Sequence, residues 1–124
     1  INETELRHEM RNKNDETKIL SAQLQRKLNT NDLLVTRGKY GAILLSKKNK
    51  NFVESPAFAK NVVDKVGAGD AMLAIISLLT KIKSPNDLSL LLGSFAGAFS
   101  VETIGNSQSI SKQKFLRHVE FSLK

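Results

Sequence analysis

Residues 64–70 read Asp64-Lys65-Val66-Gly67-Ala68-Gly69-Asp70, and the apolar stretch DAMLAIISLLTK follows at once over residues 70–81. Two glycines let a backbone turn tightly and bring its N–H groups close to a ligand. An apolar run of this length predicts a buried helix, whose free N–H groups and positive dipole end would point at the same place. The segment therefore predicts an anion hole.

An acidic residue at the start of that helix is unusual for a simple phosphate cradle, because Asp70 would repel a phosphate. The acid makes chemical sense if it takes a proton from a hydroxyl nucleophile while the amides hold the phosphoryl group being transferred. The alternative is structural: Asp70 caps the helix, and the glycines form an ordinary loop. The segment alone does not decide between the two, since glycine-rich motifs have many false positives.

Outward from this segment, apolar spacing predicts helices and strands in alternation. Asn14 or Asp15 would cap the second helix. The helix over 87–102 is rich in small residues, which permit close approach of a neighbouring element or a ligand. We expect an α/β fold in three layers, with short, largely parallel strands flanked by helices and a hairpin around residues 42–54. The predicted helices cover 2–11, 15–28, 70–81, 87–102 and 111–123; the strands cover 33–35, 42–45, 52–54 and the β-leaning segment 61–63.

Composition narrows the function classes. The chain has 124 residues, 40% of them apolar and 25% charged, which is typical of one globular domain. It has no cysteine, so disulfides, thiolate catalysis and Cys-ligated metals are excluded. No apolar run approaches the ~20 residues that a membrane helix needs, and the first residues do not resemble a signal peptide. We expect a cytoplasmic protein without a membrane partner.

The net charge of +7 leaves several partners open, among them nucleic acid, an anionic membrane surface or a small anionic ligand. Lys39, Lys47, Lys48 and Lys50 gather in one short region, whereas the other bases are scattered among acids. No aromatic residues interleave with them as in single-strand binders. A solvated face with loop lysines is therefore favoured, and nucleic acid is not expected. His8 and His118 lie far apart, so a transition-metal site is not expected either.

Three motifs in a fixed order resemble those of one enzyme family. Residues 64–70 are similar to the D-T-x-G-A-G-D signature of the ribokinase-like (PfkB) carbohydrate kinases. Val35-Thr36-Arg37-Gly38-Lys39-Tyr40-Gly41-Ala42 resembles the family's V-T-x-G-x-x-G segment, and Asn2-Glu3-Thr4-Glu5 its N-x-x-E motif. The resemblance spans essentially the whole chain. It implies a three-layer ribokinase-like (Rossmann-like) fold and an ATP-dependent sugar kinase, with a weaker likeness to the heptose-phosphate kinase branch.

The resemblance implies a role for each matching residue. Asp70 would be the general base, and the anion hole would be formed by Gly67, Ala68 and Gly69. Asn2 and Glu5 would position Mg²⁺, through water. Asp64 would lie near a monovalent-cation site, unless it is a turn cap. The positions that match nucleotide-binding ones are Thr36, Arg37, Gly38, Gly41 and Ser94.

Some matching positions depart from the family pattern. Lys65 stands where Thr or Pro is usual, and it would disturb a cation site or replace the cation with its own charge. Met72, Ile75 and Ser94 stand where Phe, Gly and Asn are common. Arg37 would reach a phosphate or remain a solvated charge at a strand end. These departures affect cation dependence and base selectivity rather than the transfer chemistry.

Members of the family are two to three times longer than this chain. The resemblance therefore implies that residues 1–124 form the C-terminal, nucleotide-binding and catalytic-base portion of a sugar kinase domain, without the N-terminal sugar-binding half and lid. Its expected ligands are ATP, Mg²⁺ and a sugar or sugar phosphate. Its expected partner is the missing half or a second copy, since part of the core would be uncovered. The alternatives are a truncated, non-catalytic nucleotide-binding module and a basic domain that binds a partner or nucleic acid.

Overall fold

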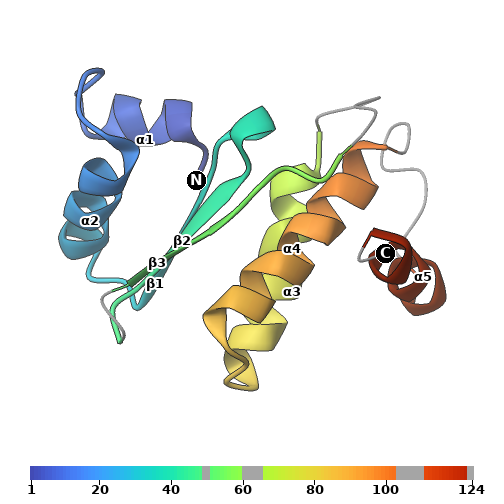
Figure 1. Cartoon of the computed structure of the whole chain (residues 1–124). Coiled ribbons are helices and arrows are strands. Elements are labelled where there is room, and N and C mark those ends of the chain that lie inside the picture. The colour runs from blue at the N-terminus through green and yellow to red at the C-terminus, as the bar shows by residue number, and fades with distance from the viewer. Residues whose placement is uncertain (49–50, 60–65, 103–110, 123–124) are drawn as a thin grey trace.

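Three layers make up the body of the computed structural model, which describes residues 1–48, 51–59, 66–102 and 111–122. A three-stranded sheet lies between two helical layers, one formed by α1 and α2 and the other by α3 and α4 (Figure 1). Helix α5 packs on the outer side of α4. The α/β class and the layering are confirmed. The helices are α1 (Glu3–Glu9), α2 (Thr17–Leu28), α3 (Ala68–Lys81), α4 (Asn86–Val101) and α5 (Lys112–Ser122), with a short 3-10 turn at Gly38–Tyr40.

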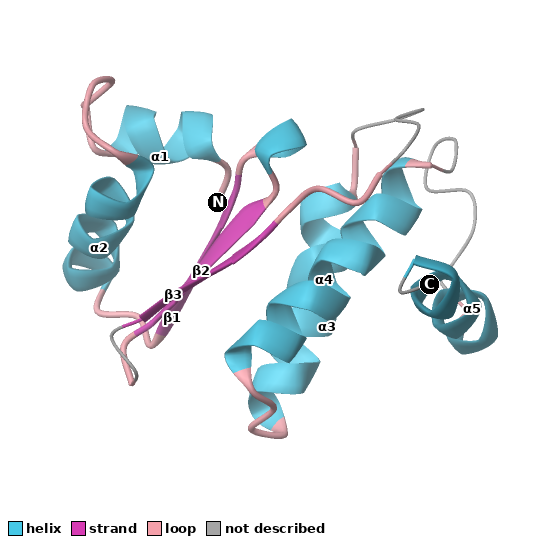
Figure 2. Cartoon of the chain, viewed as in Figure 1, coloured by secondary structure: helices cyan, strands magenta, loops and turns pink. Residues whose placement is uncertain are grey.

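The three described strands are antiparallel, with β1 (Asp32–Thr36), β2 (Ala42–Ser46) and β3 (Asn51–Ser55) in that order across the sheet (Figure 2). The hairpin predicted around 42–54 is confirmed, but the expectation of largely parallel strands is wrong for this sheet. A parallel connection needs a crossover of about a dozen residues, and the links between these strands are far shorter. Residues 61–63, predicted as a further strand, lie outside the described ranges.

A parallel contact does occur at the outer edge of β1. Asn2 forms a parallel bridge with Thr36, whose N–H donates to the Ile1 carbonyl at 3.0 Å. The Ile1 amine donates to the Leu34 carbonyl at 3.2 Å. Residues 1 and 2 therefore lie alongside the carboxyl end of β1.

The alternation of side chains along β1 divides the core in two. Leu33 and Val35 face α1 and α2, where they pack with Leu6, Leu20 and Leu24. Leu34 faces the other way, toward the cluster that α3 and α4 form with β2. Every residue of β2 is buried, because this central strand has a helical layer on both faces.

Helices α3 and α4 approach each other closely, and glycine makes this possible. A Cβ at Gly93 would lie 2.5 Å from Ile76 Cγ1, and one at Gly97 would lie 2.8 Å from Met72 Cγ. The small residues of α4 thus serve contact with a neighbouring helix at these two positions.

The outer side of α3 differs from the sequence-based expectation of a buried helix. Only Met72 and Ile76 are buried, whereas Leu73, Leu78 and Ile82 (the last at its C-cap) are 57%, 64% and 73% exposed. Exposed aliphatic side chains of this size on one helix mark a surface that another element can cover.

Smaller predictions have mixed outcomes. The second helix begins at Thr17 after Glu16, so Asn14 and Asp15 are not its cap; their N–H groups bond to Asn12 Oδ1 instead.

On α5, the His118 ring packs edge-on against Phe95 and Phe99 of α4, with centroid distances of 6.3 and 5.8 Å. Within the described ranges, no helix has both the length and the apolarity needed to cross a bilayer.

The close contact between α3 and α4 predicts a position-dependent response to alanine. Gly93→Ala should lower the free energy of unfolding by about 1–3 kcal/mol, the usual effect of overpacking. Gly69→Ala is the matched control, because its new Cβ meets nothing within 4 Å and alanine favours the helix. Chemical denaturation of both variants measures the difference, and equal stabilities would contradict this account of the packing.

Candidate functional site

The loop before α3 has the geometry that the sequence predicted. Gly67 is the helix N-cap in the left-handed region, with φ +88°, and α3 begins at Ala68. The Ala71 N–H makes the first bond of the helical ladder, to the Gly67 carbonyl at 2.9 Å, so the N–H groups from the N-cap Gly67 to Asp70 lie outside that ladder. No side chain among the described residues caps this end. These amides can therefore donate to an anion.

Asp70 lies in the first turn of α3 and is exposed to solvent. It is not the N-cap residue, which is Gly67, but an acid in the first turn also interacts favourably with the helix dipole, so the role of Asp70 as a general base stays a prediction. Within the described part of the chain, its carboxylate takes part in no hydrogen bond or ion pair. Gly69 beside it has open space where a side chain would be. A ligand can therefore approach both the acid and the amides.

Asn2 and Glu5 meet at the start of α1, as a capping box. The Glu5 N–H donates to Asn2 Oδ1, and the Asn2 N–H donates to Glu5 Oε2, both at 2.9 Å. The sequence missed this structural role, although an N-x-x-E spacing is also what a capping box requires. Both side chains remain exposed, and among the described residues Glu5 Oε1 accepts no hydrogen bond. Their assignment to Mg²⁺ stays a prediction.

The turn after β1 depends on two glycines for different reasons. Gly38 and Gly41 have φ of +57° and +83°. A Cβ at Gly41 would lie 1.9 Å from the Ser55 carbonyl oxygen, so this residue is fixed by the close approach of the chain after β3. A Cβ at Gly38 would meet nothing within 4 Å, so this glycine is open to a ligand. Thr36, half-buried, precedes the turn.

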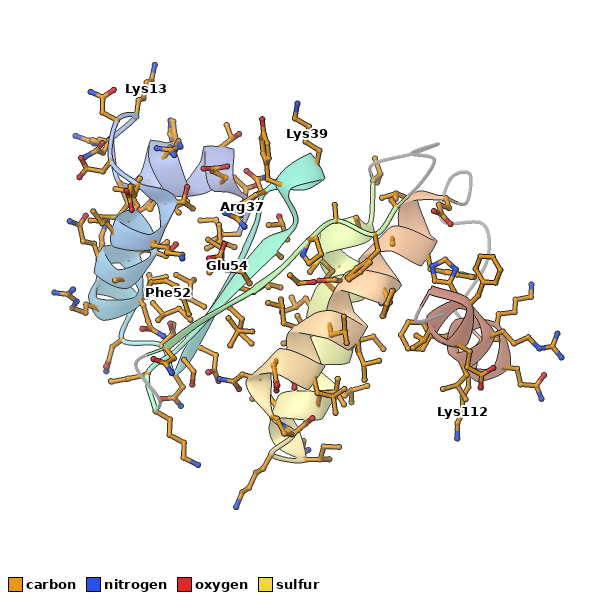
Figure 3. The ribbon with its side chains drawn as sticks, in the orientation of Figure 1. Lys13, Arg37, Lys39, Phe52, Glu54 and Lys112 are labelled. Atoms are coloured by element: carbon orange, nitrogen blue, oxygen red, sulfur yellow. The ribbon has the colours of Figure 1, made fainter. Side chains whose placement is uncertain are left out.

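Arg37 turns toward the sheet face that α1 and α2 cover. Its Nη2 donates to Glu54 Oε2 at 2.9 Å (Figure 3). The other carboxylate oxygen of Glu54 pairs with Lys18 of α2 at 2.5 Å. The hydrogen bond from Lys18 is the main cause that lowers the pKa of Glu54, and Arg37 adds to it against the cost of burial. Sequence reasoning missed Glu54 and Lys18, although the alternation with Phe52 placed Glu54 on this face.

A second polar contact ties the same helices together. Glu3 of α1 accepts hydrogen bonds from Thr17 and from Arg7, the latter at 3.0 Å. The Thr17 hydroxyl is the main cause that lowers the pKa of Glu3, followed by Arg7 against the cost of burial. The start of α1, and with it the Asn2–Glu5 box, is thereby held against the start of α2.

Three further residues that the sequence singled out are Ser94, Asp64 and Lys65. Ser94 is buried in α4, and its Oγ has no hydrogen-bond partner among the described residues. Asp64 and Lys65 lie outside the described ranges. Within those ranges, no group of three acidic, His or Cys side chains could hold a metal ion.

The lysines that cluster in the sequence do not form one patch. Lys39 belongs to the turn before β2, whereas Lys47 and Lys48 follow the other end of that strand, beside Lys83 after α3. Lys50 lies outside the described residues. The basic region thus divides between opposite ends of the sheet, which does not favour a continuous nucleic-acid surface.

Three segments far apart in sequence lie toward the same end of the sheet: the start of α1, the turn after β1 and the start of α3 (Figure 1). A profile of the pfkB family carbohydrate kinases matches residues 1–113. The chain belongs to this family. The ribokinase-like recognition is therefore confirmed.

Curated relatives are much longer than this chain. The bifunctional protein HldE of Campylobacter fetus is 32% identical over 98 residues, which cover 79% of this chain and 21% of that protein. HldE of Ectopseudomonas mendocina is 33% identical over 110 residues, or 86% and 22% of the two chains. The chain thus spans about a fifth of the length of the relatives it matches.

Solved structures confirm the fold. Ribokinase of Arabidopsis thaliana, complexed with ribose and ATP, has a TM-score of 0.83 at 22% identity; the match covers 97% of this chain and 39% of that one. Phosphofructokinase-2 of Escherichia coli, in complex with potassium, has a TM-score of 0.82 at 16% identity, with 99% and 40% covered. The chain therefore has the ribokinase-like fold over a part that corresponds to about two-fifths of each of those structures.

The Glu54 contacts predict a pH-dependent stability. Because the pKa of Glu54 is lower in the folded chain than its ordinary 4.5, the carboxylate stabilises the fold fully above that pH. The contribution is lost as the pH falls through the folded pKa. Glu54→Gln should therefore lower the free energy of unfolding at pH 7, and the difference from wild type should shrink below pH 4.5.

Urea unfolding at a series of pH values measures this difference. In a Lys18→Gln background the effect of Glu54→Gln at pH 7 should be smaller, since the largest cause of the pKa shift is gone. A difference that stays constant down to pH 3 would contradict the role of the ionised carboxylate.

Proposed function

We propose that this chain supplies the nucleotide-binding and catalytic-base side of an ATP-dependent carbohydrate kinase. The reaction transfers the γ-phosphoryl group of ATP to a hydroxyl of a sugar or sugar phosphate. The observation that supports it most is the start of α3, where free amides lie within one helical turn of the Asp70 carboxylate, which is exposed and forms no ion pair among the described residues. A binding module needs the amides but has no use for the acid.

The roles follow from where charge moves during the reaction. Asp70 accepts the proton of the acceptor hydroxyl. At the same time the oxygen of that hydroxyl forms a bond to the γ-phosphorus, and the bond between the γ-phosphorus and the β–γ bridging oxygen breaks, so that ADP leaves. The amides from Gly67 to Gly69 donate to the phosphoryl oxygens, and the positive end of the α3 dipole lowers the energy of the developing charge. The Asp70 carboxylate thus acts on the sugar hydroxyl, and the amides beside it act on the phosphoryl group of ATP.

Thr36 and Gly38 lie on the turn at the same end of the sheet, where Gly38 leaves room for the nucleotide phosphates. Asn2 and Glu5 offer exposed oxygens, the type of ligand Mg²⁺ prefers, and would hold it through water. Mg²⁺, when bound, neutralises phosphate charge. Gly41 and Ser94 would support the nucleotide-binding residues rather than contact the nucleotide. Gly41 is packed on the Ser55–Pro56 backbone, and Ser94 is buried in α4.

Two finer assignments rest on the sequence resemblance alone. A monovalent-cation site near Asp64 would be altered by Lys65, whose ammonium could take the place of the cation. The likeness to the heptose-phosphate kinase branch favours a phosphorylated heptose as acceptor. Both belong to this proposal, as does a cytoplasmic location.

The apolar outer side of α3 supports a partner. Leu73, Leu78 and Ile82 are exposed, and the solved relatives extend well beyond the part that this chain matches. We infer that the remaining half of a kinase domain, or failing that a second copy, covers this surface and brings the sugar-holding residues to Asp70.

Replacement of the base tests the proposal directly. In the full-length protein, whether this chain or a longer one, Asp70→Asn should lower kcat by at least about 100-fold, the scale of a general base. The affinity for Mg-ATP should change little, because the lost charge faces the sugar hydroxyl. Asp87→Asn is the matched control, since Asp87 is the acid in the first turn of α4. Turnover near the wild-type level in Asp70→Asn would refute the assignment.

A second test concerns the chain by itself. Residues 1–124 alone should bind Mg-nucleotide weakly and phosphorylate no sugar, because orientation of both reactants supplies about 7–11 kcal/mol of the barrier reduction. Addition of an N-terminal kinase half should restore activity. ATP consumption with a panel of sugars and sugar phosphates measures both states. Robust sugar-dependent turnover by the 124 residues would show that they hold a complete site.

A further inference from the structure

The side chain of Arg37 lies on the opposite face of the sheet from α3. Arg37 follows Val35 by two positions, and Val35 packs in the cluster under α1 and α2. Phe52 packs on the same cluster, and Glu54 follows it by two positions on β3. The ion pair between Arg37 and Glu54 therefore crosses the sheet beneath α2, away from the free amides at the start of α3.

The pair is partly shielded and shared. The Arg37 side chain is only 21% exposed, and Glu54 is 41% exposed. Glu54 offers one oxygen to Arg37 and the other to Lys18, so its charge is balanced from two elements. Arg37 Nε is buried and finds no hydrogen-bond partner in the described part of the chain. A guanidinium held in this way is directed inward rather than toward solvent.

The backbone of Arg37 is the base of the turn that carries Gly38. Its N–H donates to the Gly41 carbonyl at 2.7 Å, and its carbonyl accepts from the Tyr40 N–H at 3.1 Å. Both ends of the turn therefore close on Arg37. A side chain tied to β3 at this residue fixes how the whole turn sits on the sheet.

We propose that Arg37 is a positioning residue: its ion pair with Glu54 anchors the 36–41 turn to β3 and so sets where Thr36 and Gly38 meet the nucleotide. This differs from both roles that the sequence left open for Arg37, a direct phosphate contact and a solvated charge at a strand end. The link to the nucleotide rests on the proposed function, whereas the anchoring of the turn does not.

A double-mutant cycle separates anchoring from direct contact. In the full-length protein, Arg37→Gln and Glu54→Gln should each raise the KM for Mg-ATP by about three- to fivefold, the range for a partly exposed ion pair. The KM for the sugar should not change. The double variant should raise the KM no further than Glu54→Gln alone, since the Arg37–Glu54 contact is already absent from that single variant.

Direct phosphate contact predicts a different pattern. Glu54→Gln would then free Arg37 and leave the KM for Mg-ATP unchanged or lower, whereas Arg37→Gln alone would raise it. That pattern would overturn the proposal. Lys39→Gln is the control for charge on the same turn, because the Lys39 side chain is exposed and forms no ion pair among the described residues. It should leave the KM unchanged.

Amide hydrogen exchange measures, in the absence of nucleotide, how firmly the 36–41 turn is held. The amides of Tyr40 and Gly41, both hydrogen-bonded within the turn, should exchange faster in Arg37→Gln and in Glu54→Gln but not in Lys39→Gln. Unchanged exchange in the first two variants would overturn the proposal. If the wild-type protein neither binds nor turns over Mg-ATP, the proposed function fails. The anchoring still stands in that case if amide exchange at Tyr40 and Gly41 is faster in the two variants.

Discussion

The close packing of α3 on α4 is the constraint on which the site depends. Gly93 and Gly97 remove the side chains that would hold the helices apart, and Met72 and Ile76 occupy the space. Both side chains belong to the same buried cluster as Ala42 and Leu44 of β2 and Leu90 of α4. The position of α3 relative to the sheet is therefore set by buried contacts along the helix rather than by the loop before it. Because α3 is one continuous helix, the same packing also sets the position of its first turn, which carries Asp70 and the amides.

The opposite helical layer contributes through polar contacts as well as apolar ones. Helices α1 and α2 pack on β1 through Leu6, Leu20 and Leu24. Polar contacts of Glu3 and Glu54 connect the same elements at the end of the sheet that carries the sequence motifs. Such contacts are weak singly when exposed to water. Their effect is geometric, since each fixes a short segment that carries a predicted ligand-binding residue.

Sequence reasoning found the parts of the site whose chemistry is local. The glycines before an apolar run predicted a helix N-terminus, and the structure has Gly67 and Ala68 there. The hairpin also followed from a local turn. Strand direction was missed, although the short links between strands carried that information. The exposure of Leu73 and the Arg37–Glu54 pair depend on which elements meet in space, and no local pattern specifies that.

The bridge at the outer edge of β1 affects how the chain meets other chains. An edge strand with unpaired N–H and C=O groups is a template for strand addition and, from there, for fibrous aggregation. Here Ile1 already bonds to Leu34 and Thr36, so the carboxyl half of a five-residue strand is occupied. A strand from another molecule would have to displace residues 1 and 2 before it could bond to the Leu34 carbonyl and the Thr36 N–H, and this half of the edge is thereby protected against sheet extension from one molecule to the next.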